Sequence, residues 1–253
     1  MAVQTEKKTV KLIITRQDGP DQPSYKETFE VPYRPNMNVI SALMEIQRNP
    51  VNADGKETKP VCWEANCLEE VCGACSMVIN GKARQACTAL VDKLEQPIRI
   101  EPMKTFPVLR DVIVDRGRMF EALKKVKAWI PIDGTHDLGP GPRMNEKKRQ
   151  EAYELSKCMT CGVCLEVCPN VNENNSFIGP APISQVRLFN SHPTGEMNKD
   201  DRLAALMGDG GIEGCGNSQN CVQSCPKGIP LTTSIAVLNK ETNKYMFRKW
   251  LNS

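Results

Sequence analysis

The chain has 253 residues, of which 40% are hydrophobic and only 5% aromatic, and its formal net charge is +3. A charge this small excludes a strongly basic nucleic-acid-binding protein, and the length is typical of one or two domains. No run of 18 apolar residues occurs and the first residues are polar, so we expect neither a membrane span nor a signal peptide. Without export, the twelve cysteines would face a reducing compartment, where metal binding is more common than disulfide formation.

The N-terminal part of the sequence has the pattern of a small β-rich domain. Segments rich in β-branched residues predict strands at residues 9–16, 28–34, 76–80 and 98–101. Asn38 is placed to cap a helix that continues to about Asn49. Two strands, a helix and further strands around a cysteine-containing loop are typical of a β-grasp domain of the plant-type ferredoxin kind. We place this domain at residues 1–105.

The rest of the sequence predicts a connecting segment and then a mostly helical domain. The connection covers residues 106–142, with a charged helix expected at 111–128 and a Pro/Gly-rich stretch at 131–142. The helical domain covers residues 143–253. Its helices are expected near residues 146–157, 183–190, 199–207 and 232–250. The predicted fold class is therefore α+β, a plant-type ferredoxin domain followed by a helical domain of the bacterial two-cluster ferredoxin type.

The first group of cysteines has the spacing C-x4-C-x2-C-x11-C. Its members are Cys67, Cys72, Cys75 and Cys87. This spacing is the plant-type signature of an iron–sulfur cluster. Gly73 lies between two of the cysteines, where the missing side chain lets backbone N–H groups approach the sulfides. Structural zinc is the alternative, but such sites usually show two matched C-x2-C pairs. The spacing therefore predicts a [2Fe–2S] cluster bound by these four cysteines.

The second group has the spacing C-x2-C-x2-C-x3-C-P, which is the bacterial-type signature. It consists of Cys158, Cys161, Cys164 and Cys168, followed by Pro169. In two-cluster ferredoxins the fourth cysteine of such a run binds the other cluster. By that rule Cys168 belongs with the third group of cysteines, which supplies Cys225 in return. We therefore predict a [4Fe–4S] cluster bound by Cys158, Cys161, Cys164 and Cys225.

The third group reads C-x2-S-x2-C-x3-C-P from Cys215 to Pro226, with Ser218 where a cysteine would complete the motif. Three thiolates remain for the second cluster of this domain, namely Cys168, Cys215 and Cys221. A fourth iron would lack a good ligand, so we predict a [3Fe–4S] cluster with Ser218 as a non-ligand at the vacant ligand position. The alternative is a fourth iron held by a serine alkoxide or by water.

The remaining polar and cysteine residues carry weaker signals. Cys62 lies outside the complete first group, and an unpaired cysteine more often acts as a small buried hydrophobe than as a ligand. His136 and His192 are expected in surface loops, with contact to a quinone or a partner as the alternative. The basic segments 143–149 and 240–249 are expected to be solvated faces, although they could also dock an acidic partner or anionic headgroups.

The order of the three motifs, which covers almost the whole chain, resembles the iron–sulfur subunit of succinate dehydrogenase and fumarate reductase (complex II). Residues 66–87, 155–171 and 215–235 look most similar to subunits from Gram-positive bacteria. The resemblance implies the same distribution of cysteines among the clusters. It also implies a membrane-associated electron-transfer subunit of succinate:quinone oxidoreductase, an oxidoreductase of the respiratory chain and the tricarboxylic acid cycle. Electrons would pass from an FAD-containing flavoprotein subunit through the [2Fe–2S], [4Fe–4S] and [3Fe–4S] clusters to a membrane quinone.

The same resemblance implies where the protein acts and that the succinate chemistry takes place on a different subunit. Succinate chemistry would take place on the flavoprotein, so no catalytic residue is expected in this chain. An integral cytochrome b-type anchor would hold the subunit peripherally at the cytoplasmic face of the cell membrane. A fumarate reductase that runs the reaction in reverse and a free-standing multi-cluster ferredoxin are the alternatives.

Two positions depart from the pattern of ubiquinone-reducing relatives. Those relatives have a tryptophan pair shortly after the Cys-Pro of the second group and a histidine directly after the first cysteine of the third. Here Asn170 follows Pro169, and Gly216 follows Cys215. We therefore expect menaquinone as the acceptor.

Overall fold

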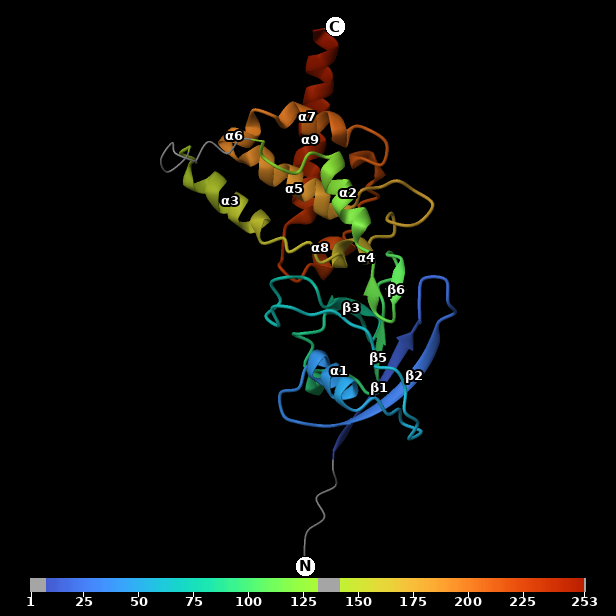
Figure 1. Cartoon of the computed structure of the whole chain (residues 1–253). Helices are drawn as coiled ribbons and strands as arrows, with labels where there is room; N and C mark the ends of the chain where they lie inside the picture. Colours follow the sequence, from blue (N-terminus) through green and yellow to red (C-terminus); the bar gives the residue numbers. More distant parts are fainter. Residues whose placement is uncertain (1–7, 132–141, 253) are drawn as a thin grey trace, which may run out of the picture. The chain divides into compact units, whose positions relative to one another are not determined.

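The computed structural model describes residues 8–131 and 142–252, and the chain divides into two compact units (Figure 1). We call Met1–Asp115 the N-terminal unit and Arg116–Ser253 the C-terminal unit. The predicted Pro/Gly-rich stretch lies almost entirely outside the described residues.

The N-terminal unit is built on a five-stranded sheet with the strand order β2-β1-β5-β3-β4. The strands are β1 (Thr9–Arg16), β2 (Tyr25–Pro32), β3 (Ser76–Ile79), β4 (Lys82–Gln85) and β5 (Ile98–Glu101). β1 pairs antiparallel with β2 and parallel with β5, and β3 pairs antiparallel with both β5 and β4. Alternate residues of β1 (Val10, Leu12 and Ile14) are completely buried, because successive side chains of a strand point to opposite faces. The four predicted strands are confirmed, whereas β4 was not expected.

Helix α1 (Val39–Arg48) covers the core of this unit. The side chain of Asn38 accepts a hydrogen bond from the backbone N–H of Ser41 at 2.8 Å, as an N-cap residue does. Val39, Leu43 and Ile46 face the strands and are almost fully buried. The predicted cap and helix are confirmed.

The charged helix expected at residues 111–128 is only partly correct. Its first residues instead belong to a two-stranded ribbon of β6 (Val108–Arg110) and β7 (Ile113–Val114), and only α2 (Gly117–Lys125) is helical. Asp111 between the two strands has φ of +47°. A residue in this left-handed region cannot continue a right-handed helix, so the chain turns there.

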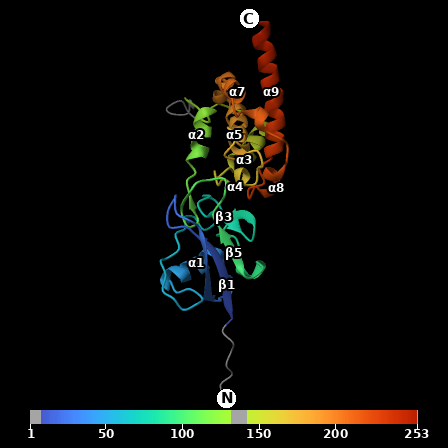
Figure 2. The ribbon, with the colours of Figure 1, turned by 90° about the vertical axis from the view of Figure 1, so that its right-hand side faces the viewer.

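The C-terminal unit is helical. Besides α2 it contains α3 (Glu146–Ser156), α4 (Val163–Glu166), α5 (Pro180–Ser191), α6 (Pro193–Glu196), α7 (Lys199–Leu206), α8 (Asn220–Ser224) and α9 (Leu231–Leu251). The long helices α3, α5, α7 and α9 fall close to the predicted ranges, whereas the one-turn helices α4, α6 and α8 were not expected. α9 packs along α5, and its last turns extend beyond the other helices of this unit (Figure 2).

Candidate iron–sulfur sites

The loop between α1 and β3 wraps its backbone around the sulfur of Cys67. Leu68 and Glu70 have positive φ angles of 60° and 56°, which turn the following amides back toward the cysteine. The backbone N–H groups of Glu69, Val71 and Cys72 donate to Cys67 Sγ at 3.4, 3.3 and 3.3 Å. These three donors lower the pKa of Cys67 to about 6. The loop is thus shaped to hold Cys67 as a thiolate, which is the form that binds iron.

The other cysteines of the first group lie around the same point. The backbone N–H of Cys67 donates to Cys72 Sγ at 3.5 Å. Cys75 precedes β3 and Cys87 follows β4, and both are buried. Burial and then the neighbouring Cys75 and Cys67 raise the pKa of Cys87 to about 11. A thiol with so high a pKa is protonated at neutral pH unless a cation binds it, so this set has the chemistry expected for a metal cluster.

The C-terminal unit brings Cys225 to the three cysteines around α4. Burial, followed by nearby Cys158 and Cys225, raises the pKa of Cys161 to about 11. The pKa of Cys164 lies well above its usual value through complete burial, with further contributions from the other three thiols. All four sulfur-bearing residues line one mostly apolar cavity. The structure therefore brings together the four cysteines that the motif rule assigned to the [4Fe–4S] cluster.

The last three cysteines form a separate neighbourhood where α4 and α8 pack together. Burial raises the pKa of Cys221, and the neighbouring Cys168 and Cys215 raise it further. Burial also raises the pKa of Cys168, and Cys215 adds to that increase. Two side-chain amides connect the third group to the second. Asn170 Nδ2 donates to the Gly214 carbonyl at 2.7 Å, and Asn220 Nδ2 donates to the Val167 carbonyl at 3.1 Å.

Ser218 lies in an exposed loop beside this second neighbourhood. Its neighbours Asn217 and Gln219 have positive φ angles of 53° and 63°, so the chain turns sharply on both sides of it. Among the residues that the structure describes, no three His, Cys, Asp or Glu side chains converge on a single metal ion. In an iron–sulfur cluster the cysteines are shared among several iron atoms, with at most two on one iron, so they surround a larger volume.

Known proteins match both units. A family model described as a 2Fe-2S iron-sulfur cluster binding domain matches residues 11–121, and one described as a 4Fe-4S dicluster domain matches residues 154–229. The chain is 74% identical to the succinate dehydrogenase iron-sulfur subunit of Bacillus subtilis over 249 residues, which cover 98% of each protein. The chain belongs to the iron–sulfur subunits of the succinate dehydrogenase and fumarate reductase family.

More distant relatives agree with this assignment. The fumarate reductase iron-sulfur subunit of Wolinella succinogenes is 28% identical over 89% of this chain and 92% of its own length. A chain of the solved structure "Mycobacterium smegmatis Sdh1 complex in the apo form" has the same fold, with a TM-score of 0.74 and 24% identity over 96% of this chain and 98% of its own. The predicted fold class is confirmed, and so are the predicted [2Fe–2S] and [4Fe–4S] cofactors of this family member.

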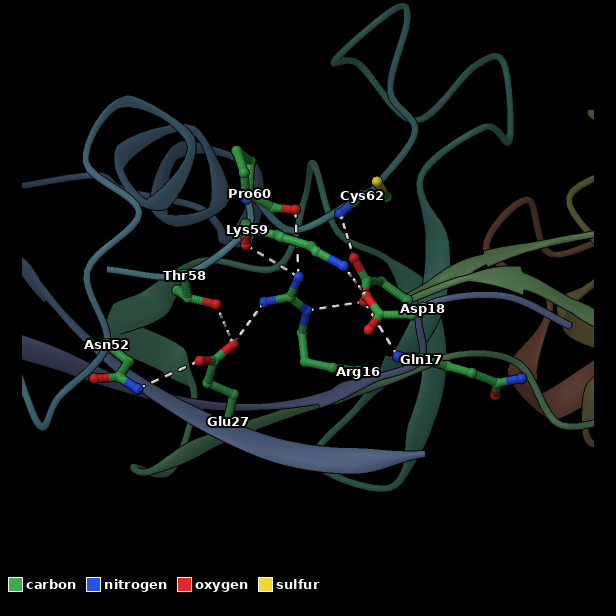
Figure 3. A network of polar contacts seen from close by, with 10 residues as sticks. Arg16, Gln17, Asp18, Glu27, Asn52, Thr58, Lys59, Pro60 and Cys62 are labelled. Carbon is green, nitrogen blue, oxygen red and sulfur yellow. Dashed lines mark hydrogen bonds and ion pairs between the residues drawn. The ribbon is translucent and has the colours of Figure 1, made fainter. Parts of the chain in front are cut away.

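A buried network of charged residues holds the segment that precedes the first cysteine loop of this iron–sulfur subunit (Figure 3). The guanidinium of Arg16 donates to Asp111 at 2.8 Å, to Glu27 at 2.6 Å, and to the carbonyls of Lys59 and Pro60 at 3.1 and 3.3 Å. The other oxygen of Asp111 accepts the backbone N–H of residue 62 at 2.8 Å. The network thus fixes residues 59–62, five residues before Cys67. No local sequence pattern indicates it, because Arg16 and Asp111 are 95 positions apart.

The structure also shows the surroundings of Cys62 and His192, two residues outside the three cysteine groups. Cys62 is half-buried, and its backbone N–H takes part in the Arg16 network. His192 caps α6, where its Nδ1 accepts hydrogen bonds from the backbone N–H groups of Thr194 and Gly195. His136 lies outside the described residues. None of the helices within residues 8–131 and 142–252 combines the length and the hydropathy that a membrane span requires.

Proposed function

We propose that this chain is the electron-transfer subunit of a succinate:quinone oxidoreductase. The observation that carries the proposal is the 74% identity, over 98% of both chains, to the succinate dehydrogenase iron-sulfur subunit of Bacillus subtilis. When bound, the clusters accept and release single electrons, which this polypeptide cannot do by itself. We assign no catalytic residue to the chain, and succinate oxidation belongs to a partner flavoprotein that contains FAD.

The cysteine neighbourhoods support one ligand set for each cluster. Cys67, Cys72, Cys75 and Cys87 would hold [2Fe–2S]. Cys158, Cys161, Cys164 and Cys225 would hold [4Fe–4S]. Cys168, Cys215 and Cys221 would hold [3Fe–4S]. The thiols of each set influence one another's ionisation, and burial raises the pKa of several of them, so bound iron would be the positive charge that keeps them deprotonated.

We further propose that a cytochrome b-type integral membrane subunit anchors this chain at the cytoplasmic face of the cell membrane, and that menaquinone is the acceptor. The region after Cys215 supports the quinone assignment. A Cβ atom on Gly216 would lie 3.0 Å from the side-chain oxygen and nitrogen of Asn170. Asn170 therefore fills the space into which the histidine of ubiquinone-reducing relatives would have to project.

The test of this function is to isolate the tagged chain from its native membrane in mild detergent. We expect it to co-purify with a flavoprotein and an integral membrane subunit, and the complex to reduce a menaquinone analogue with succinate. A chain that purifies alone, with clusters but without partners, would instead be a free-standing ferredoxin. Preferential fumarate reduction by the complex would favour the fumarate reductase alternative.

Ser218→Cys is expected to convert the [3Fe–4S] cluster to [4Fe–4S]. The variant places a fourth thiolate at the position that completes the C-x2-C-x2-C motif, beside Cys221. Electron paramagnetic resonance of the oxidised complex should lose the [3Fe–4S] signal, and the iron content should rise by one atom per chain. Ser24→Cys, an exposed serine of the N-terminal unit, is the matched control and should leave the spectrum unchanged. An unchanged [3Fe–4S] signal in Ser218→Cys would contradict the assigned alignment.

A further inference from the structure

Two buried polar side chains face each other next to Cys75. Ser76 on β3 and Gln85 on β4 are directly opposite in the antiparallel ladder, so both side chains lie on the same face of the sheet. Gln85 is completely buried and Ser76 is 5% exposed. Burying an amide and a hydroxyl costs free energy unless both are hydrogen-bonded. Both side chains therefore need hydrogen-bond partners in the surroundings of Cys75.

Both members of this pair have hydrogen-bond partners close to Cys75. Gln85 Nε2 donates to Ser76 Oγ at 2.9 Å, and Ser76 Oγ donates to the Gly73 carbonyl at 2.8 Å. The thiol of Cys75 donates to Gln85 Oε1 at 3.5 Å. The last contact requires a proton on the sulfur. A thiolate bound to iron has no proton to donate, so the amide oxygen would then face an anionic sulfur.

A half-turn of the Gln85 amide removes this conflict. The oxygen and nitrogen of a glutamine side chain are nearly the same in shape, so exchanging them leaves the heavy-atom positions in place. Nε2 would then lie 3.5 Å from Cys75 Sγ, and Oε1 would lie 2.9 Å from the Ser76 hydroxyl. Ser76 can donate to that oxygen because a hydroxyl both donates and accepts. The rearrangement costs the bond from Ser76 to Gly73.

We propose that, in the cluster-loaded subunit, Gln85 donates an N–H···S hydrogen bond to the Cys75 thiolate, that Ser76 orients it, and that this bond raises the reduction potential of the [2Fe–2S] cluster. The proposal rests on the ligand set proposed above. A donor aimed at a ligand sulfur stabilises the more negative, reduced cluster more than the oxidised one. The effect is strong here because the pair is shielded from water, where electrostatic interactions are weakly screened. Gln85 is thus a positioning and tuning residue and not a catalytic one.

The test is a redox titration of the purified complex, with the [2Fe–2S] signal followed by electron paramagnetic resonance. Gln85→Leu should lower the potential, with an about tenfold change in the oxidised-to-reduced ratio at a given ambient potential, or about 59 mV for a one-electron couple. Ser76→Ala should shift it in the same direction by less. Gln96→Leu makes the same exchange at an exposed position and should leave the potential unchanged.

A second measurement needs no variant. The wild-type complex is labelled with ¹⁵N in the glutamine side-chain amides. Pulsed electron paramagnetic resonance of the reduced [2Fe–2S] cluster should then detect an amide nitrogen that is weakly coupled to the electron spin of the cluster. Its absence, or an unaltered potential in a cluster-replete Gln85→Leu complex, would overturn the proposal while leaving the proposed function intact. Loss of the [2Fe–2S] signal from the wild-type complex would instead overturn the ligand set itself.

Discussion

Replacing Asp111 by alanine is expected to lower the free energy of unfolding of the N-terminal unit by about 3–5 kcal/mol, the usual cost of removing one partner of a buried ion pair. The side chains of Arg16 and Asp111 have no exposed surface. The variant leaves a buried guanidinium with Glu27 as its remaining carboxylate, and that side chain is 12% exposed. It also removes the acceptor of two backbone N–H groups, those of Gln17 and Cys62.

The loss in the free energy of unfolding is measured by urea unfolding of the full chain, with hydrogen exchange at the amides of β1 as the probe of the N-terminal unit. Asp18→Ala is the matched control, because its partner Lys59 is 66% exposed and the oxygen–nitrogen distance is 3.4 Å. An exposed pair of this kind contributes about 1 kcal/mol or less. An Asp111→Ala effect as small as that of the control would contradict the role assigned to the network.

The double variant Arg16→Met with Asp111→Leu separates the charge from the packing. Replacing both partners by apolar residues of similar volume leaves no unpaired buried guanidinium. Glu27 loses its ion pair with Arg16 but still accepts hydrogen bonds from Asn52 at 3.3 Å and from Thr58 at 3.2 Å. The double variant should therefore be less destabilising than Asp111→Ala alone. The two substitutions are therefore expected to be strongly non-additive. Additive losses would show that the two residues act independently.

Sequence patterns predicted the long elements of the fold because these elements depend on local signals. Strand 9–16 is rich in β-branched residues, and Asn38 caps the helix that begins at Val39, as the structure confirms. The pattern failed where a distant residue decides the conformation. Asp111 adopts a left-handed conformation between β6 and β7 while it pairs with Arg16, so the helix expected there begins only at Gly117.

Cysteine spacing predicted more of the site than any other feature, because the ligands of a cluster come from short motifs. It placed Cys225 with the second group, and the structure brings that residue to the same cavity as Cys158. The residues that surround the cysteines have no comparable sequence motif. Ser76 and Gln85 become neighbours only through the register of β3 with β4, and β4 was not predicted.

Cys221→Ser is expected to abolish the [3Fe–4S] signal and, with it, electron delivery to quinone. Cys221 lies in α8 and is 6% exposed. Its pKa is raised by burial and further by Cys168 and Cys215. With Ser218 also unable to supply a thiolate, only two sulfur ligands remain, which is too few to retain the cluster. Succinate-dependent reduction of a soluble dye at the flavoprotein should persist, and the signals of the other two clusters should remain.

Cys62→Ser is the control for this experiment, because it exchanges the same atoms at a cysteine outside all three ligand sets. Only the backbone N–H of Cys62 takes part in the Arg16 network, so serine preserves that contact. All three cluster signals and quinone reduction should match the wild-type complex. A [3Fe–4S] signal that survives Cys221→Ser, or one that disappears in Cys62→Ser, would show that the third thiolate comes from a different residue. The division of eleven cysteines into sets of four, four and three would then have to be redrawn.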